Sequence, residues 1–185
     1  MFDRQGNRKY LNWRERETFF RAVRRDSDPF SKAFCLTLFY TGCRISEALG
    51  VTCERVDFTE KALIFETLKR RHRGHYRSVP IPDNLLELLE EILKDRNPTD
   101  KVWKYSRPTA YRLIKRTTEQ AKLTGSKACP KGLRHSFAIA CISREIPLTT
   151  IQKWMGHARL ETTAIYLNAV GEEERQLAKR LWKSA

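Results

Sequence analysis

One stretch of the chain predicts a helix that is apolar on nearly every side. It lies between the turn-forming residues 26–29, Asp-Ser-Asp-Pro, and the pair Thr41-Gly42, and its apolar positions include Ala33, Leu36, Leu38 and Phe39. A helix that has no polar stripe cannot lie on a protein surface, so other elements must surround it. The helix is therefore expected to lie deep in the core.

Composition points to a folded domain with a polyanionic partner. The chain has 185 residues, 41% of them hydrophobic, which suits one domain or one domain with a small appendage. Lys and Arg number 36 against 22 Asp and Glu, a formal net charge of +14 that favours nucleic acid. No apolar stretch suits a bilayer span or a signal peptide, and no lipidation motif stands out, so no membrane partner is expected.

The cysteines and histidines do not form a metal-binding pattern. The cysteines are odd in number and contain no C-x-x-C pair, and the four histidines do not recur at zinc-ligand spacing. We expect free thiols in a reducing cytoplasm, several of them filling the core, and no metal or cofactor. The five are Cys35, Cys43, Cys53, Cys129 and Cys141.

The remaining elements are short. Asn12 and Glu15 predict a capped helix start, and 56–65, with a turn near 59–61, predicts a pair of strands. A third strand is expected at 76–81. Further helices are expected from about Arg44, Asp83, Pro108, Lys131, Leu148, Leu160 and after Gly171.

Three motifs stand among these elements, and each also has a purely structural interpretation. TGCRISEAL holds Arg44 and Glu47, which on a surface helix would be a weak ion pair, but Arg44 follows a glycine turn at the end of the buried helix. GHARLETTAIY holds His157 and Tyr166, and a lone tyrosine at the end of a short helix is usually a packing residue. KGLRHSF holds Arg134, whose neighbour His135 we interpret as a buried, hydrogen-bonded core histidine.

Together, two arginines, a histidine and a late tyrosine resemble the catalytic domain of the tyrosine recombinases, the phage integrase family. The resemblance runs from about Tyr10 to the C-terminus, which leaves residues 1–9 as a flexible leader. It implies an α+β fold, mainly α-helical with a small three-stranded antiparallel sheet. It departs from the family in one position: the H-x-x-R motif begins here with Lys131.

The resemblance implies a role for each motif residue in cleaving and rejoining DNA through a 3′-phosphotyrosine. Arg44 and Arg134 would clamp the phosphate, because guanidinium donors stabilise the charge that develops on its oxygens. His157 would donate to the same oxygens, and Tyr166 would be the nucleophile. Glu47 would support this site by holding the arginine or the histidine in place.

The general acid of the family lies on a β-hairpin, and here the basic run LKRRHRGHYR occupies that hairpin. Lys69 is our choice for the acid that protonates the leaving 5′ oxygen. Lys131, an ammonium that can only donate while charged, is expected to contact phosphate and not to deprotonate Tyr166. The other basic residues of the run, and one side of the helix at 108–122, are expected to contact DNA: Arg70, Arg71, Arg73, Arg77, Arg112, Lys115 and Arg116.

By the same resemblance, double-stranded DNA is the partner and strand exchange takes place within a tetramer. The final helix carries an apolar stripe of Leu177, Leu181 and Trp182 that would dock in a neighbouring protomer, and the free chain is expected to be a monomer. The family's separate N-terminal core-binding domain is expected to be absent. An excised fragment and a naturally short recombinase, like the fimbrial phase-variation invertases, both remain open.

Three other functions compete with recombination. A type IB topoisomerase shares the chemistry, but the short chain and the close spacing of Gly156-His157 and Tyr166 favour a recombinase. A DNA-binding module that kept the fold and lost catalysis is supported by Lys131. A generic RNA-binding domain has little support, since no aromatic-rich platform motif is visible.

Overall fold

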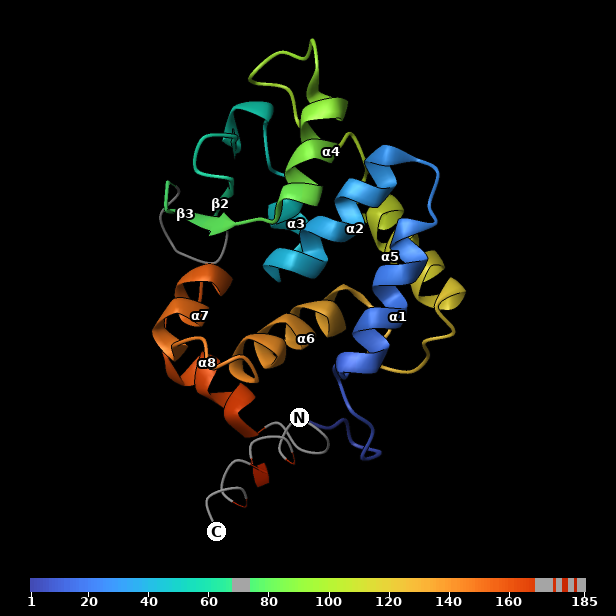
Figure 1. Ribbon diagram of the computed structural model, residues 1–185, viewed down its shortest axis with the longest axis vertical. Coiled ribbons are helices and arrows are strands. Elements are labelled where there is room, and N and C mark those ends of the chain that lie inside the picture. Colours follow the sequence, from blue (N-terminus) through green and yellow to red (C-terminus); the bar gives the residue numbers. More distant parts are fainter. Residues whose placement is uncertain (68–73, 169–174, 176–177, 180–181, 183–185) are drawn as a thin grey trace.

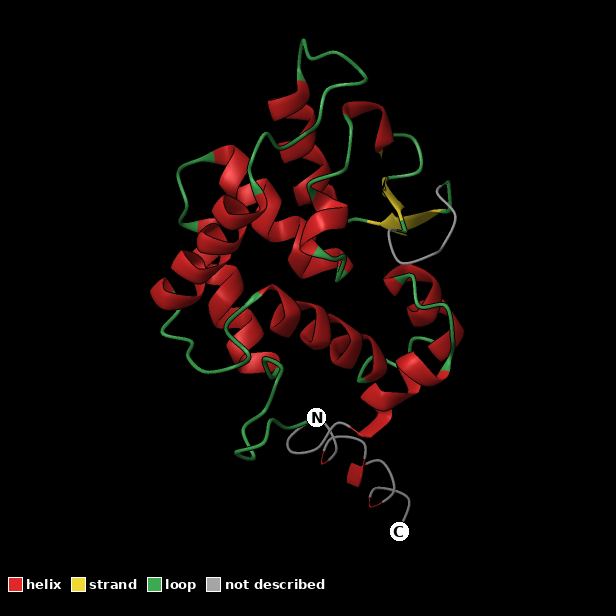
Figure 2. Ribbon diagram, turned by 180° about the vertical axis from the view of Figure 1, so that it is seen from behind, coloured by secondary structure: helices red, strands yellow, loops and turns green. Residues whose placement is uncertain are grey.

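The structure is a computed structural model that describes residues 1–67, 74–168, 175, 178, 179 and 182 (Figure 1). Most of it is helical, with a small sheet at one side (Figure 2). In chain order the elements are α1 Trp13–Arg24, α2 Pro29–Thr41, α3 Ile45–Ala48, η1 Cys53–Arg55, β1 Val56–Asp57, β2 Ala62–Glu66, β3 Tyr76–Pro80, α4 Asp83–Leu93, α5 Arg107–Gln120, α6 Pro130–Ile142, α7 Leu148–Met155, α8 Glu161–Ala164 and η2 Ile165–Asn168.

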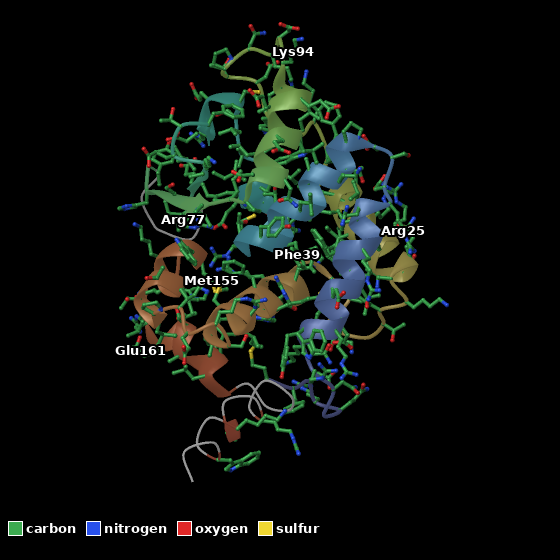
Figure 3. All side chains as sticks on the ribbon, in the orientation of Figure 1. Arg25, Phe39, Arg77, Lys94, Met155 and Glu161 are labelled. Atoms are coloured by element: carbon green, nitrogen blue, oxygen red, sulfur yellow. The ribbon has the colours of Figure 1, made fainter. Side chains whose placement is uncertain are left out.

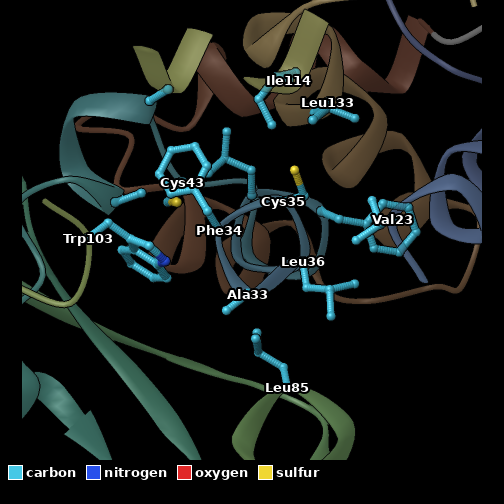
Figure 4. Packing of buried hydrophobic residues seen from close by; sticks show 14 of the residues in the cluster. Val23, Ala33, Phe34, Cys35, Leu36, Cys43, Leu85, Trp103, Ile114 and Leu133 are labelled. Carbon is cyan, nitrogen blue, oxygen red and sulfur yellow. The ribbon is translucent and has the colours of Figure 1, made fainter. Parts of the chain in front are cut away.

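Helix α2 lies at the centre of the fold, which confirms the prediction from its apolar sequence. α1, α4, α5 and α6 all contact it. Phe34, Cys35 and Leu36 meet residues from several of these elements in the largest core cluster (Figure 4). The ring of Phe34 packs edge-on against that of Trp103, with centroids 5.4 Å apart. Burying apolar surface on all sides of one helix is the main force that orders its neighbours.

The ends of α1 and α2 form as their sequences predict. The side chain of Asn12 accepts from the N–H of Glu15 and the Glu15 carboxylate accepts from the N–H of Asn12, a complete capping box. Gly42 ends α2 at φ 59°, a left-handed conformation that favours glycine. A Cβ at Gly42 would also lie 2.4 Å from Cδ1 of Phe137, so any larger residue would displace α6.

The sheet has the order β1-β2-β3 and is antiparallel throughout. β2 and β3 pair from Ala62 opposite Pro80 to Glu66 opposite Tyr76. Burial alternates along β3, so that Arg77 and Val79 face inward. α7 contacts β3, which brings the C-terminal part of the fold against the sheet.

Helix α6 divides the interior into two clusters. Its Leu133 belongs to the large core around α2, whereas Phe137, Ala138, Ile139 and Cys141 join a second cluster with α7 and η2. Tyr166 and Tyr10 are both buried in this second cluster. The candidate nucleophile is therefore packed between α6 and α7 and does not lie on the surface.

Residues 1–9, predicted to be a flexible leader, make specific contacts in the structure. Phe2 pairs with Arg8 in an isolated bridge, and the Arg8 guanidinium lies 3.3 Å from the Glu15 carboxylate. Met1 packs against the second cluster. Of the predicted final helix, Leu177 and Leu181 lie outside the described residues, and Trp182 is exposed.

Candidate active site

Three arginines converge on one buried carboxylate, that of Glu47. Its side chain is fully buried, with Oε1 2.6 Å from Nη1 of Arg44 and Oε2 2.6 Å from Nη2 of Arg77. Nη1 of Arg134 lies 4.0 Å from Oε2. Burial acts to raise the pKa of Glu47, but Arg77 and Arg44 hold that pKa below its ordinary value, so the carboxylate stays charged. A weak surface pair between Arg44 and Glu47 is thereby ruled out.

Arg134 is held by two backbone carbonyls. Nη1 donates to the carbonyl of Gly42 at 2.8 Å and Nη2 to that of Met155 at 2.7 Å, which ties α6 to the ends of α2 and α7. Met155 lies at this junction in Figure 3. Burial, and next the charge of Arg44, lower the pKa of Arg134 to about 10, so that the guanidinium remains charged at neutral pH.

Arg77 was predicted to contact DNA, and the structure shows that this is wrong. Arg77 is only 6% exposed and lies on the inner face of β3 (Figure 3). Besides the bond to Glu47, Nε donates to the carbonyl of Trp154 at 2.7 Å and Nη1 to the hydroxyl of Thr67 at 3.1 Å. The pleat of β3 explains the error, because alternate side chains point inward and a basic sequence does not say which ones.

His157 follows Gly156, which caps α7 at φ 66° as predicted. Nδ1 of His157 lies 2.9 Å from the hydroxyl of Thr163. Burial first, then the charges of Arg134 and Arg44, lower the pKa of His157 to about 4, so the ring is neutral at pH 7. If Nδ1 accepts from the Thr163 hydroxyl, the neutral ring carries its proton on Nε2, which can then donate to a phosphate oxygen.

Tyr166 lies in η2 and is only 2% exposed. Its ring stacks on that of His157, with centroids 6.2 Å apart and planes 9° from parallel. Burial raises the pKa of Tyr166 above its ordinary value, while the positive charges of Arg134 and Arg44 act in the opposite direction. The phenol is therefore protonated at neutral pH and must lose its proton to act as a nucleophile.

Sequence reasoning missed the partner of the tyrosine hydroxyl. His135 is buried and hydrogen-bonded, as predicted for a core histidine, but Nδ1 bonds the hydroxyl of Tyr166 at 3.0 Å. Burial first, then the charges of Lys131 and Arg134, lower the pKa of His135 to about 4. The position of His135 next to Arg134 was the available signal for this contact. Successive side chains of a helix point to different neighbours, so His135 can contact Tyr166 while Arg134 contacts other groups.

The other predicted residues that the structure describes lie on α5 and α6. Lys131 is exposed in the first turn of α6, one helical turn before His135. On α5, Arg112 is exposed and Lys115 is half-buried, while Arg116 lies 3.1 Å from the carboxylate of Asp26. The predicted general acid and three predicted DNA contacts lie outside the described residues: Lys69, Arg70, Arg71 and Arg73.

Among the residues that the structure describes, no group of three or more His, Cys, Asp or Glu side chains is arranged to hold a metal ion. In the same part of the chain, every helix is too short or too polar to cross a bilayer.

The fold has counterparts among solved structures. The crystal structure of XerA recombinase matches with a TM-score of 0.79 and 23% identity, over 92% of this chain and 64% of that one. The catalytic domain of bacteriophage HP1 integrase matches with a TM-score of 0.67 and 20% identity, over 92% of this chain and 93% of that one. The fold is therefore that of a tyrosine recombinase catalytic domain, which confirms the predicted α+β class.

Sequence comparison then gives the family. The profile of the phage integrase family matches residues 9–173, and the chain belongs to that family. Tyrosine recombinase XerA of Pyrococcus furiosus is 32% identical over 155 residues, which are 78% of this chain and 52% of the relative. A tyrosine recombinase of Thermosipho africanus is 28% identical over 177 residues, 93% of this chain and 61% of the relative. The chain thus spans between half and two thirds of the length of these relatives.

Proposed function

We propose that the chain is the catalytic part of a site-specific DNA recombinase that cleaves and rejoins duplex DNA through a 3′-phosphotyrosine. The observation that carries this proposal is the shared setting of Arg44, Arg134, His157 and Tyr166. Both arginines act electrostatically on the tyrosine hydroxyl and on the histidine, and the two rings are stacked. The relatives named tyrosine recombinase support the same reaction.

In the proposed reaction, the oxygen of Tyr166 attacks a backbone phosphorus and its proton passes to solvent water. The P–O5′ bond breaks, the 5′ oxygen takes up a proton, and phosphate becomes linked to the tyrosine. Arg44 and Arg134 offset the charge on the non-bridging oxygens, and Nε2–H of His157 donates to one of them. A 5′ hydroxyl from a second strand then attacks the phosphotyrosine and releases Tyr166. The bond energy is retained in the intermediate, so rejoining needs no nucleotide cofactor.

Two lysines complete the proposed reaction. Lys69 is the proposed acid for the 5′ oxygen, because the general acid of the family lies on the β2–β3 hairpin. Lys131 is proposed to contact the same phosphate as Arg134, since both lie in the N-terminal half of α6. The exposed residues of α5, together with Arg70, Arg71 and Arg73, would bind the DNA backbone.

We also propose that the chain acts in the cytoplasm and assembles as a tetramer on DNA. All five cysteines are free thiols, which is compatible with a reducing compartment. The apolar residues of the last segment would dock in a neighbouring protomer. Deleting residues 172–185 should then weaken tetramer formation on DNA in native gels more than it lowers the melting temperature. A truncated chain that assembles normally would rule out this mode of assembly.

The reaction can be tested by trapping the covalent intermediate. Duplexes that the protein binds are first selected from a random pool and then rebuilt with a nick on the 3′ side of each candidate phosphate, so that cleavage releases a short fragment bearing the free 5′ hydroxyl, which diffuses away. Wild type should form an adduct that survives SDS, and Tyr166→Phe should form none while it binds the same DNA. If wild type forms no adduct on any selected duplex, the chain is a DNA-binding module.

That binding module is the second candidate function. The observation that favours it is Lys131, an ammonium where the family motif has an imidazole. Relaxation of supercoiled plasmid without sequence preference would instead favour a topoisomerase-like activity.

A further inference from the structure

We propose that His135 positions the nucleophile, by accepting a hydrogen bond from the hydroxyl of Tyr166 at Nδ1. This inference rests on the proposed function and concerns a residue outside the set of side chains assigned to the phosphate. The bond joins α6 to η2, two elements in contact, and its length is 3.0 Å. His135 touches the oxygen that would form the new bond to phosphorus.

The local structure gives Tyr166 little support of its own. η2 is a four-residue 3-10 turn that follows the four-residue α8, so few backbone bonds fix the direction of the phenol. α6, by contrast, has 13 residues and is buried along most of its length. A side chain on α6 can therefore fix the position of the Tyr166 oxygen on η2.

The direction of the hydrogen bond follows from burial. A phenol that is 2% exposed needs an acceptor for its proton, and among the described residues Nδ1 of His135 is the partner the hydroxyl bonds. His157 cannot serve in the same way, since it faces the ring of Tyr166 and its Nδ1 bonds Thr163. The two histidines thus have different proposed roles. His157 donates to the phosphate, and His135 accepts from the hydroxyl of Tyr166.

The charges around His135 favour an acceptor that stays neutral. Burial, Lys131 and Arg134 lower its pKa to about 4, so at neutral pH the ring is uncharged. Such a ring can hold the hydroxyl proton in a hydrogen bond but is a weak base for keeping it. Its role is therefore to orient the tyrosine oxygen, and the proton passes to solvent water as the P–O bond forms.

Three variants separate orientation from packing. His135→Phe keeps an aromatic ring and removes the acceptor, whereas His135→Asn can place its amide oxygen where Nδ1 was. Ser136→Ala is the matched control: it lies next in the same buried helix, and its hydroxyl accepts from the N–H of Leu11 at 2.7 Å and donates to the carbonyl of Gly132 at 2.6 Å. Thermal melts of all three set a temperature at which each variant is folded.

Cleavage of the selected nicked duplex is then measured at saturating protein. His135→Phe should cleave about tenfold more slowly, the size of one lost hydrogen bond, with unchanged DNA affinity. His135→Asn and Ser136→Ala should stay close to wild type. Nitrogen-15 spectra of the histidine rings should show Nδ1 of His135 without a proton, and its resonance should move in Tyr166→Phe.

Each other result overturns the proposal in a distinct way. A His135→Phe protein that cleaves as fast as wild type, or faster, shows that the bond is dispensable or holds the tyrosine back. Equal losses in His135→Phe and His135→Asn show that His135 only packs, and a proton on Nδ1 reverses the hydrogen bond. If wild type forms no adduct at all, the proposed function falls together with the positioning role, which distinguishes that failure from the others.

Discussion

Glu47 and Arg77 form an ion pair in the interior, with Nη2 2.6 Å from Oε2, that joins α3 to β3. Both side chains are almost completely buried, and the same guanidinium reaches the end of α7 through the carbonyl of Trp154. The Glu47 carboxylate, which orients Arg44, is therefore itself held in place by a residue of the sheet. This relationship links β3 to Arg44 through two residues.

The first prediction concerns Arg77→Met. Removing the guanidinium leaves the buried charge of the Glu47 carboxylate with less positive charge beside it. The hydroxyl of Thr67 and the carbonyl of Trp154 also lose a hydrogen-bond donor. The free energy of unfolding should fall by about 3 kcal/mol, measured in urea, because one partner of a buried pair is lost. Arg112→Met, on the exposed side of α5, should change stability by less than about 0.5 kcal/mol.

Arg77→Met also tests whether Arg77 contacts DNA. Where both proteins are folded, Arg77→Met should keep the wild-type dependence of DNA affinity on salt, because a buried guanidinium releases no counterions. A weaker salt dependence in Arg77→Met would return Arg77 to the DNA interface.

The second prediction separates the two clamp arginines. Arg44→Ala and Arg134→Ala should each slow cleavage by about 10²-fold or more, with DNA binding largely intact. Arg134→Ala should also lower the melting temperature, because the carbonyls of Gly42 and Met155 lose their donor. Arg159→Ala, an exposed arginine of the same region, is the control for general loss of charge. Near wild-type cleavage by either clamp variant removes that arginine from the site.

Sequence reasoning reached most of the fold because local signals agree with the tertiary structure. The apolar helix α2, the capping box of α1 and the glycine caps at Gly42 and Gly156 each have a local physical cause. Each of them was predicted and each is present. The resemblance to the tyrosine recombinases likewise implied that Arg44 and Arg134 lie near one another, and Nη1 of each lies within 4.0 Å of the Glu47 carboxylate.

What sequence could not give is the partner of each side chain. The basic run says nothing about which residues of β3 point inward, so Arg77 was assigned to DNA although it binds Glu47. His135 was correctly expected to be buried, but its bond to Tyr166 spans 31 positions and depends on how η2 packs against α6. Such contacts follow from tertiary packing, which no local pattern encodes.

The third prediction concerns stability at mildly acid pH. His135 and His157 have folded-state pKa values of about 4, below their ordinary value of 6.5, so the unfolded chain binds their protons first. Their contribution is present above pH 6.5 and is lost as pH falls toward 4. Unfolding should therefore take up about two additional protons within this window, seen as a falling urea midpoint.

A double variant isolates this effect from the carboxylates. In the double variant His135→Asn, His157→Gln, the urea midpoint should fall less between pH 6.5 and pH 4.5. The range stops at 4.5 because that is the ordinary pKa of a glutamate such as Glu47. An equally steep fall in the double variant would mean that other groups are responsible.

The fourth prediction compares two arginines on α5. Arg112 is exposed, whereas Arg116 already pairs with Asp26 at 3.1 Å. Arg112→Ala should lower the slope of log affinity against log salt by about 1, and Arg116→Ala should lower it by less, because its charge is partly neutralised. Fluorescence anisotropy across a salt series measures both. Equal slopes for the two variants would show that the Asp26 pair opens on DNA.

The last prediction concerns Lys131, at the start of α6. The residue is exposed in the first turn of α6 and its charge is one cause, after burial, of the lowered pKa of His135. Lys131→Ala should therefore raise the pKa of His135 toward its ordinary value without reaching it, which NMR titration can follow. The same variant should slow cleavage without unfolding the domain, because one phosphate contact is lost, and Lys131→His should retain cleavage.

Two outcomes would change the interpretation of Lys131. Full-rate cleavage by Lys131→Ala would make it an ordinary surface lysine, although its effect on the pKa of His135 would persist. If wild type were inert and Lys131→His restored the adduct, the chain would be a DNA-binding module descended from a recombinase. In that case a single imidazole at the start of α6 would separate binding from catalysis, since Arg44, Arg134, His157 and Tyr166 are all in place.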